Sequence, residues 1–490
     1  MKRSIFLAVC IALFYHIDIK AQTFNILDYG AKNDTSVLST EAINKAIDAC
    51  SKAGGGKVVF PAGNFKSGTI VMKSNVYLFL ENGACLYAST RQQDFPRQPL
   101  PAYRSQKDTG GWYALIYGEG LNNTGITGSG TINGQGALQK SRPECLTGDR
   151  DGRPRNILFI SCNNIHVSGI TLMNSGMWCQ HYLNCEDMVV DKIKVFNHSN
   201  RNNDGIDFDG CRRVVLTNSI IDSDDDGIVL KSTGISPCEE IIVSGCIVSS
   251  HTNAIKLGTE STGGFRNISI TNCVIRPSRS TTKSIFNTPK IGVSGISLEI
   301  VDGGTMEGVL VSNITIEGTE CPLFVRLGNR ARKHVEEAPE PPMGVMKNIM
   351  ISNIIAYNAG NYSSSITGVP GGKIENITLH NFRAYSRGGL KEGEFIPDFT
   401  QVKEDEKGYP NPGVWKNLPS YGLFIRHVKE AVIDNVGFEA PDEIRIPVIA
   451  VDVDHLVIKE MTVPKSATDV LLENVEKFSI DQKLIVKKHN

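Results

Sequence analysis

Three aspartates in two short segments have the residue type and spacing expected of a carboxylate catalytic centre. Asp204 lies in "NNDGIDFDG", and Asp225 and Asp226 lie in "SDDDGIVLKS". When like charges are brought close together, the pKa of at least one of them rises, so one carboxylic acid can stay protonated near neutral pH. A protonated acid beside an ionised base is the pair that hydrolysis of a glycosidic bond requires. We therefore predict that these three aspartates form a catalytic group.

Two other interpretations concern the same acidic segments. Asp222 and Asp224 are expected to shape the turn, because aspartate commonly bonds the local backbone at strand ends. Several close carboxylates can also bind calcium, which takes oxygen ligands. A calcium site would suit a polysaccharide lyase that uses Lys231 or Lys256 as its base. The sequence leaves this lyase open as an alternative to a hydrolase without a metal or other cofactor.

Recurring phrases along the chain indicate the elements that position these acids. Five of them start at Cys162, Cys185, Cys211, Cys238 and Phe265, with separations of 23, 26, 27 and 27 residues. Each phrase consists of two short alternating β runs joined by a polar turn. A period in the twenties with almost no helical periodicity is typical of a parallel β-helix, whose coils stack about 4.8 Å apart. A β-sandwich has no reason to repeat one phrase at one period, so we predict an all-β solenoid.

One helix and several inserts complete the predicted organisation. The stretch "STEAINKAIDACSKA" from Ser39 has apolar residues at helical spacing and is expected to cap the first coil. Inserts at 95–112, 139–155 and 386–420 carry Pro, Gly and aromatic residues and are expected to wall a cleft. We predict one domain over 22–490, divided into an N-terminal cap with the first coils (22–90), a loop-rich insert (91–155), central coils with the active site (156–386), a loop insert (387–420) and C-terminal coils (421–490).

Composition and the N-terminus limit the partners and the location. Lys and Arg number 51 against 52 for Asp and Glu, so no global field favours nucleic acid or an anionic membrane. Lys2 and Arg3, an apolar run over 5–15 and Ala21 before Gln22 are typical of a signal peptide over 1–21. We expect an exported monomer, periplasmic or extracellular, with a polysaccharide or oligosaccharide substrate and no transmembrane segment after signal removal. The 12 cysteines include no C-x-x-C pair, so neither a zinc cage nor a dense disulfide framework is indicated.

A third β run in each coil gives an internal alignment. Alternation points one apolar column inward and the residues between its members outward. The inward column contains Ile206, Ile228, Ile255 and Ile296. The first outward column is expected to contain Asp207, Val229, Lys256, Ser297 and Arg326, and the next Asp209, Lys231, Gly258 and Glu299. Asp204, Asp226 and Asn253 fall on successive coils at the mouth of these runs. We expect the acid and the base to be roughly 6.5 to 9.5 Å apart, the separation typical of inverting hydrolysis.

These motifs resemble glycoside hydrolase family 28, the polygalacturonase-like enzymes, whose fold is a right-handed parallel β-helix. The family's Asn-x-Asp motif matches Asn202 to Asp204, and its Asp-Asp motif matches Asp225 and Asp226, followed by "IVLKS". The resemblance implies an inverting hydrolase of pectic polysaccharides. It implies that Asp225 is the general acid, and that Asp204 with Asp226 positions and deprotonates the attacking water.

Two family motifs are missing from their expected positions. The family histidine position is occupied by Asn253, and His251 lies two residues earlier, either reaching the site or belonging to the turn. The Arg-Ile-Lys motif that grips a galacturonate carboxylate is replaced by Ser297, Leu298 and Glu299. Lys256 and Arg326 are predicted to supply a displaced grip, with solvated surface charge as the alternative. A mixed pectic backbone such as a rhamnogalacturonan then becomes as good a candidate substrate as polygalacturonan.

Two aromatic residues lie one coil before Asp204. Trp178 is expected to stack on a sugar ring, or else to be a core residue at a strand end, and His181 is expected beside it at the substrate. Because two family motifs are displaced, a non-catalytic glycan-binding solenoid is a further alternative to the enzyme.

Overall fold

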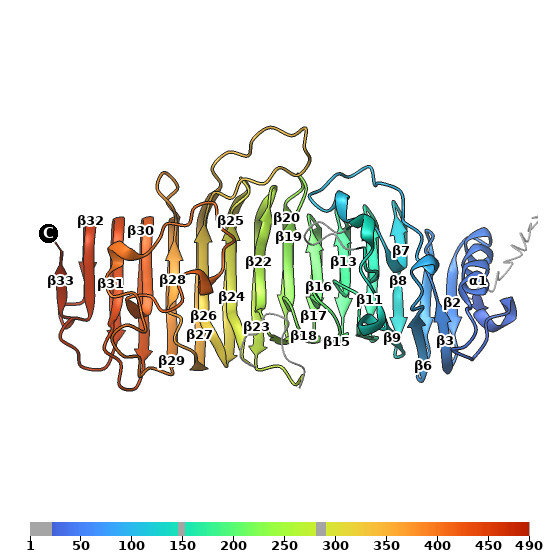
Figure 1. The fold of residues 1–490 in the computed structure, drawn as a ribbon, viewed down its shortest axis with the longest axis horizontal. Coiled ribbons are helices and arrows are strands. Elements are labelled where there is room, and N and C mark those ends of the chain that lie inside the picture. Colours follow the sequence, from blue (N-terminus) through green and yellow to red (C-terminus); the bar gives the residue numbers. More distant parts are fainter. Residues whose placement is uncertain (1–21, 146–151, 281–290, 490) are drawn as a thin grey trace, which may run out of the picture.

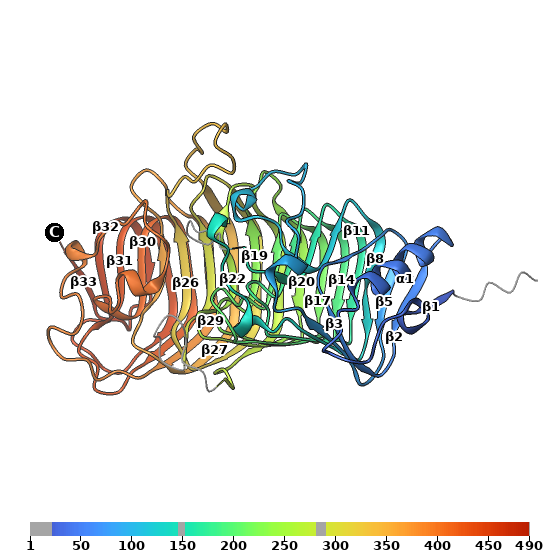
Figure 2. The same ribbon diagram turned by 45° about the vertical axis from the view of Figure 1, so that its right-hand side comes forward.

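The computed structural model describes residues 22–145, 152–280 and 291–489, so the predicted signal peptide lies outside the described residues. Parallel strands wind into an elongated solenoid, with α1 (Thr40–Lys52) at one end and the C-terminus at the other (Figures 1 and 2). The strands stack in three columns, one for each face of the coil. Crossover connections between parallel strands of one sheet are right-handed. The predicted right-handed parallel β-helix is confirmed.

The first column forms the face that carries the predicted acids, here called the site face. Its strands are β4 (Ile70–Val71), β7 (Ala114–Glu119), β10 (Arg155–Ile160), β13 (Gln180–Leu183), β16 (Ile206–Asp209), β19 (Ile228–Ser232), β22 (Asn253–Ser261), β24 (Gly292–Ile300), β26 (Thr319–Leu327) and β28 (Ser364–Thr367).

The other two columns close the coil. The second contains β1 (Thr23–Asn25), β2 (Gly56–Phe60), β5 (Val76–Leu80), β8 (Asn122–Gly128), β11 (Asn163–Ser168), β14 (Glu186–Asp191), β17 (Arg212–Thr217) and β20 (Cys238–Ser244). The third contains β3 (Gly63–Ser67), β6 (Ala84–Ala88), β9 (Thr131–Asn133), β12 (Thr171–Met173), β15 (Lys194–Asn197), β18 (Ile220–Ser223) and β21 (Ile247–Ser250).

Later coils join these columns into longer strands. Strands β23 (Gly264–Ile275), β25 (Thr305–Glu317), β27 (Val345–Ala359) and β29 (Glu375–Ser386) run through the second and third columns. Strand β30 (Ser420–Glu439) pairs with both β28 and β29, and is followed by β31 (Ile446–Thr462), β32 (Val470–Ile480) and β33 (Val486–Lys488).

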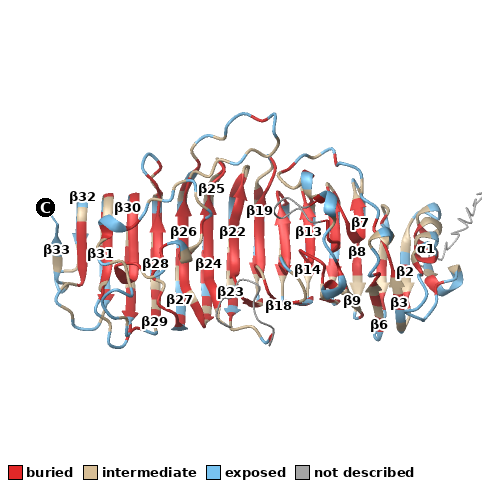
Figure 3. Ribbon diagram, viewed as in Figure 1, coloured by how far each residue is buried: buried red, intermediate tan, exposed pale blue. Residues whose placement is uncertain are grey.

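The register of the site face follows the predicted apolar column. Ile206 pairs with Ile228, Ile228 with Ile255, and Ile255 with Ile296, and all four side chains are buried. Figure 3 shows this burial continuing along the strands of successive coils. Burying one face of every strand excludes water from the interior and makes a one-residue slip very unfavourable.

One part of the predicted alignment is wrong. Arg326 pairs with Glu299, and Phe324 instead pairs with Ser297. A shift of two residues keeps every inward side chain inward, so alternation alone does not distinguish the two registers. Arg326 therefore does not share an outward column with Lys256.

The predicted capping helix is present. Helix α1 buries Ile43, Ala46, Ile47 and Cys50 against the first coil, while its outer face is polar. It covers strand edges that would otherwise be open to pairing with another chain. No helix among the described residues is long and apolar enough to cross a membrane.

Candidate active site

A cleft of about 450 Å³ lies on the outer side of the site face. On either side of it, apolar clusters cover the outer surface of the sheet: Trp112 packs on Leu158 and Leu183 at the N-terminal side, and Trp415 packs with Phe324 at the C-terminal side. Trp112 belongs to the predicted wall insert 95–112, and Trp415 belongs to the predicted wall insert 386–420. The loops that follow β6 and β26 rise along the upper edge of the solenoid in Figure 1. Between the two covered sections the outer surface carries charged side chains.

The three predicted aspartates meet in this cleft. Backbone hydrogen bonds of 2.9 Å run from Gly205 N–H to the Asp226 carbonyl and from Gly227 N–H to the Asn253 carbonyl. They place Asp204, Asp226 and Asn253 on adjacent coils. One oxygen of each of Asp204, Asp225 and Asp226 lies within 4.8 Å of the others. The acids therefore come together as predicted, but their nearest oxygens are closer than the expected separation of roughly 6.5 to 9.5 Å.

Asp226 is the carboxylate that is held in its ionised form. Its Oδ1 accepts hydrogen bonds from Asn253 Nδ2 at 2.6 Å and Thr252 Oγ1 at 3.0 Å, and its Oδ2 lies 3.1 Å from Lys256 Nζ. Burial acts to raise its pKa, but Lys256 and Lys231 and these hydrogen bonds hold the pKa below the ordinary value. Both oxygens of Asp226 thus have polar partners.

Asp225 has the opposite tendency although it is the next residue in the chain. Burial and the adjacent negative charge of Asp226 raise its pKa to about 7, against the opposing effect of the nearby lysines. Burial, Asp207 and Asp225 also raise the pKa of Asp204 well above its ordinary value. The cleft therefore combines a carboxylic acid that is protonated near neutral pH with a carboxylate that is ionised.

Lys231 lies at the centre of a second set of acids beside this group. Its Nζ is 3.8 Å from Asp204 Oδ2, 3.6 Å from Asp207 Oδ1 and 3.7 Å from Glu260 Oε2. Burial raises the pKa of Asp207 to about 7, whereas Lys107 and Lys231 overcome burial at Glu260 and lower its pKa. Lys231 lines the cleft, but its charge is shared among three carboxyl groups.

His251 lies outside the cleft lining, contrary to its predicted catalytic position. Its Nδ1 is 2.8 Å from Asp224 Oδ1. The neighbouring His198 Nε2 is 2.8 Å from Asp222 Oδ1, and the two imidazole centroids are 5.0 Å apart. Asp222 and Asp224 bind histidines from neighbouring coils, so the prediction that they mainly bond their own turn is corrected. The cleft position next to Asp226 is taken by Thr252 and Asn253.

Trp178 lines the cleft, but His181 lies beneath it. His181 Nε2 is 3.0 Å from Asp209 Oδ2, and its buried ring meets the edge of Trp178 at a centroid distance of 4.8 Å. Lys107 Nζ and Lys231 Nζ lie 4.9 and 4.8 Å from the indole centroid. His181 therefore supports the indole and has no surface to offer a substrate, which corrects its predicted role. Asn202 lines the cleft, and its Oδ1 accepts a 3.2 Å hydrogen bond from Arg153.

The predicted displaced cationic grip is wrong for both of its members. Lys256 is only 1% exposed and lies between Asp226, Glu299 at 3.9 Å and the Tyr409 hydroxyl at 3.1 Å. Arg326 donates to the backbone carbonyls of Gly368, at 2.9 Å, and Glu404. Neither side chain lines the cleft, because each already neutralises or anchors a part of the protein.

The positions of the missing Arg-Ile-Lys motif are also buried. Ser294 Oγ bonds Asn253 Oδ1 at 2.6 Å and lies 2.8 Å from Ser297 Oγ, which extends the hydrogen-bond chain from Asp226. Glu299 accepts a 2.9 Å hydrogen bond from Thr259, and burial raises its pKa to about 7. These residues lie below the cleft floor and support the aspartates that line it.

Several lining residues were not found from the sequence. Lys107, Arg332 and Tyr409 come from three different inserts, which have no repeat to align. Thr252 lies between two residues that were singled out, His251 and Asn253. The signal that could have found it is its place just before the first residue of β22.

The fold and the carboxylate site define a β-helix protein of the carbohydrate-active kind. The sequence model described as "Glycosyl hydrolases family 28" matches residues 50–382. The chain therefore belongs to glycosyl hydrolases family 28, and the resemblance inferred from its motifs is confirmed.

Curated relatives agree with this assignment, and a solved structure shares the fold. A "Probable polygalacturonase" from Vitis vinifera is 32% identical over 44% of this chain and 45% of its own length. An "Exo-poly-alpha-D-galacturonosidase" from Dickeya chrysanthemi is 27% identical over 42% of this chain and 41% of its own. The chain thus spans about half the length of the curated relatives it matches. The crystal structure of a "hyperthermoactive Exopolygalacturonase from Thermotoga maritima" shares the fold, with a TM-score of 0.62 and 23% identity over 75% of this chain and 88% of the other.

Proposed function

We propose that this protein is an exported, inverting glycoside hydrolase that cleaves a pectic polysaccharide of the galacturonan or rhamnogalacturonan type. The observation that carries the proposal is the meeting of Asp204, Asp225 and Asp226 in one cleft, with one oxygen of each within 4.8 Å of the others. Their surroundings raise the pKa of Asp225 and lower that of Asp226, as an acid and a base require. Family membership and the polygalacturonase relatives support the substrate class. The N-terminal pattern of Lys2, Arg3 and the apolar run supports export.

In this mechanism Asp225 donates its proton to the glycosidic oxygen as the bond to the anomeric carbon breaks. A water held by Asp204 and Asp226 attacks the anomeric carbon from the opposite side and gives its proton to Asp226. Asp226 Oδ1 accepts hydrogen bonds from Asn253 and Thr252, whereas Oδ2 is paired with Lys256 alone and keeps a lone pair that can accept the proton of the water. Membership of the family, not the carboxyl separation, supports inversion.

A calcium-dependent lyase is the alternative that the same acids suggest, since their oxygens are close enough to share an ion. Lys231 and Lys256 already bring two positive charges to within 3.8 Å of Asp204 and 3.1 Å of Asp226. A divalent cation would be repelled by these ammonium groups at short range. The charges therefore favour hydrolysis without a metal.

The test is hydrolysis of defined pectic oligosaccharides by wild-type protein and by Asp225→Asn. We expect new reducing ends without ultraviolet absorbance, no loss of rate in chelator, and an inverted product anomer by NMR. An unsaturated product, or dependence on calcium, would support the lyase instead. Equal glycan binding by both proteins without any sugar release would support a non-catalytic glycan-binding protein. A retained anomeric configuration would contradict the assignment of Asp226 as the base.

A further inference from the structure

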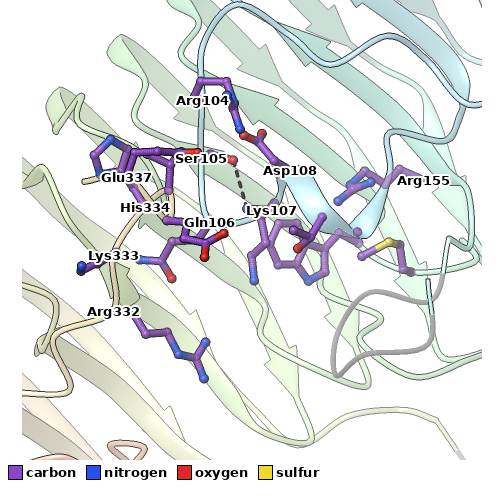
Figure 4. Close-up of a pocket in the computed structure, with 16 residues that line it drawn as sticks. Arg104, Ser105, Gln106, Lys107, Asp108, Arg155, Arg332, Lys333, His334 and Glu337 are labelled. Carbon is purple, nitrogen blue, oxygen red and sulfur yellow. Dashed lines mark hydrogen bonds and ion pairs between the residues drawn. The ribbon is translucent and has the colours of Figure 1, made fainter. Parts of the chain in front are cut away.

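A second pocket, of about 750 Å³, adjoins the catalytic cleft. Its lining includes Lys107, Met177, Trp178 and Arg332, which also line the cleft, so the two spaces are continuous. Figure 4 shows its two facing segments, one carrying Arg104, Lys107 and Asp108 and the other carrying Arg332, Lys333 and His334. We call this space the basic pocket.

Most cations of the basic pocket are already paired. Arg104 Nε is 2.5 Å from Asp108 Oδ2, Lys107 Nζ is 3.0 Å from Glu260 Oε1, and Lys333 Nζ is 2.9 Å from Glu340 Oε1. Arg332 is exposed, and within the described ranges its guanidinium forms no salt bridge with a carboxylate. It is thus a full positive charge placed at the junction of the basic pocket and the cleft.

The backbone of Arg332 is held in place although its side chain is exposed. Asp302 is buried, and its Oδ1 accepts hydrogen bonds of 3.0 Å from both Arg332 N–H and Arg330 Nε. Its Oδ2 accepts a 3.3 Å hydrogen bond from Gln106 of the facing segment. Asp302 therefore links the two inserts just beneath Arg332. Because the backbone of Arg332 is already held in place, it loses little conformational entropy when the side chain binds a ligand.

The opposite end of the cleft has no comparable charge. Its lining there includes Tyr362, Tyr409 and Asn411, all uncharged. Lys256 is buried against Asp226, and the missing family cations are replaced by Ser297 and Glu299. Five Lys and Arg side chains and three carboxylates, those of Asp108, Glu336 and Glu337, line the basic pocket, so the net positive charge lies on that side of the cleft.

We propose that Arg332 binds the carboxylate of an acidic sugar unit, a uronate, that lies in the basic pocket next to the bond to be cleaved. The guanidinium can bind a carboxylate through two parallel hydrogen bonds. The carboxylate-binding function lost from the strand positions of Ser297 and Glu299 is thus supplied from an insert. This proposal rests on the proposed function, because it assumes a pectic substrate.

The test is Arg332→Gln, assayed on one pectic oligosaccharide in its free-acid form and in its methyl-esterified form. We expect KM for the free acid to rise about tenfold, the effect of losing one charge-assisted interaction, and KM for the ester to change less than about twofold. The matched control is Arg266→Gln on the exposed outer surface of β23, which should leave both KM values unchanged. Equal effects of Arg332→Gln on acid and ester, or no effect on either, would overturn the proposal.

Binding to a catalytically impaired background separates this proposal from the proposed function. Affinity of Asp225→Asn and of Asp225→Asn with Arg332→Gln for the free-acid oligosaccharide is measured by titration calorimetry. Weaker binding by the double variant, about tenfold, supports the basic pocket even if the wild type releases no sugar, a result that would by itself end the hydrolase proposal. Equal binding by the two proteins overturns the basic pocket even if the wild type is fully active.

Discussion

Asp222 and Asp224 lie just before Asp225 in the turn that leads into β19, and their pKa values are shifted in the opposite direction to that of Asp225. Asp222 and Asp224 bind His198 and His251, and these partners lower both pKa values in spite of burial. Asp225 faces the cleft, where burial and Asp226 raise its pKa to about 7. All of these residues are wholly or largely removed from solvent. The comparison teaches that the identity of the partner, more than the depth of burial, decides which acid carries a proton.

The two sets of aspartates are connected through the first residues of the next coil. His251 donates its backbone N–H to the Ser223 carbonyl at 3.2 Å, and its side chain holds Asp224. The hydroxyl of the next residue, Thr252, lies 3.1 Å from Asp225 Oδ1 and 3.0 Å from Asp226 Oδ1, and is a hydrogen-bond donor to both carboxyl groups. We call His198, His251, Asp222 and Asp224 the supporting group, and the proposed acids Asp204, Asp225 and Asp226 the catalytic group. Variants in the catalytic group should mainly lower kcat, and variants in the supporting group should have smaller effects on kcat or affect stability alone.

The largest effect is expected in the catalytic group, from Asp225→Asn. The amide cannot donate the proton that the leaving oxygen needs, so kcat should fall about 10³-fold, within the range for general acid catalysis. The fall in kcat is measured from the initial rates at which new reducing ends are released. Thermal unfolding is the control and should occur at the same or a higher temperature, because a repulsive buried charge is removed. Retention of more than about a tenth of the activity would contradict the assignment of Asp225 as the acid.

The next largest effect is expected from Lys256→Met, which leaves Asp226 without its ion pair. Lys256 now lowers the pKa of Asp226, so its removal should raise that pKa and leave the base protonated over a wider range of acidic pH. The acidic limb of the pH–rate profile should move upward by about one unit or more, and the rate at pH 5 should fall about tenfold. Lys429→Met, which breaks the exposed pair with Glu375, is the control. An unmoved acidic limb would show that Lys256 does not set the charge of Asp226.

The pH profile of the wild type should itself reveal the raised pKa of Asp225. Above about pH 7 the acid ionises and the rate should fall, while the ionised Asp226 keeps the rate up at lower pH. In the unfolded chain the pKa of Asp225 is roughly 4, so the unfolded chain releases this proton at a lower pH than the folded protein does. Asp225 therefore lowers the free energy of unfolding as the pH rises from about 4 to about 7. Comparing denaturant unfolding of wild type and Asp225→Asn at pH 4.5 and 7.5 should show the variant gaining relative stability at the higher pH. A constant difference between the two proteins would contradict the pKa shift.

A smaller effect is expected in the supporting group, from His251→Gln. The amide can still donate to Asp224, so kcat should fall by less than about tenfold, far less than for Asp225→Asn. KM should be unchanged, because His251 does not line the cleft. A loss comparable with that of Asp225→Asn would instead place His251 among the groups that act on the substrate.

The smallest effect is expected from His198→Gln and should appear in stability alone. The carboxylates of Asp222 and Asp224 outweigh burial and raise the pKa of His198 above its ordinary 6.5. A raised histidine pKa contributes stability that is fully present below about pH 6.5 and is lost as pH rises through the folded value. The melting temperature of the variant should fall by a few degrees at pH 5.5 and by less at pH 8.5. An equal change at both pH values would mean that His198 is neutral in the fold.

The sequence by itself determined the solenoid and the meeting of Asp204, Asp225 and Asp226 in its cleft. The isoleucines of the inward column, from Ile206 to Ile296, pair with one another on successive coils. Because one face of each strand is buried, neighbouring strands can differ in register only by an even number of residues. Once that register is set, Asp204 and Asp226 must lie on adjacent coils, because their distances from the aligned isoleucines are equal. A local, repeated pattern was therefore sufficient.

Only the tertiary structure decided which side chains surround those acids. The alternation of inward and outward side chains is the same in two registers that differ by two residues. The sequence therefore predicts that Arg326 lies opposite Ser297, whereas it lies opposite Glu299. Lys107 and Glu260 are 153 residues apart, and Gln106 and Asp302 are 196 apart, so no repeat links them. The inserts that carry the cations of the basic pocket have no periodic neighbours to pair with. Their positions depend on long-range contacts that form only when the whole coil stack is complete.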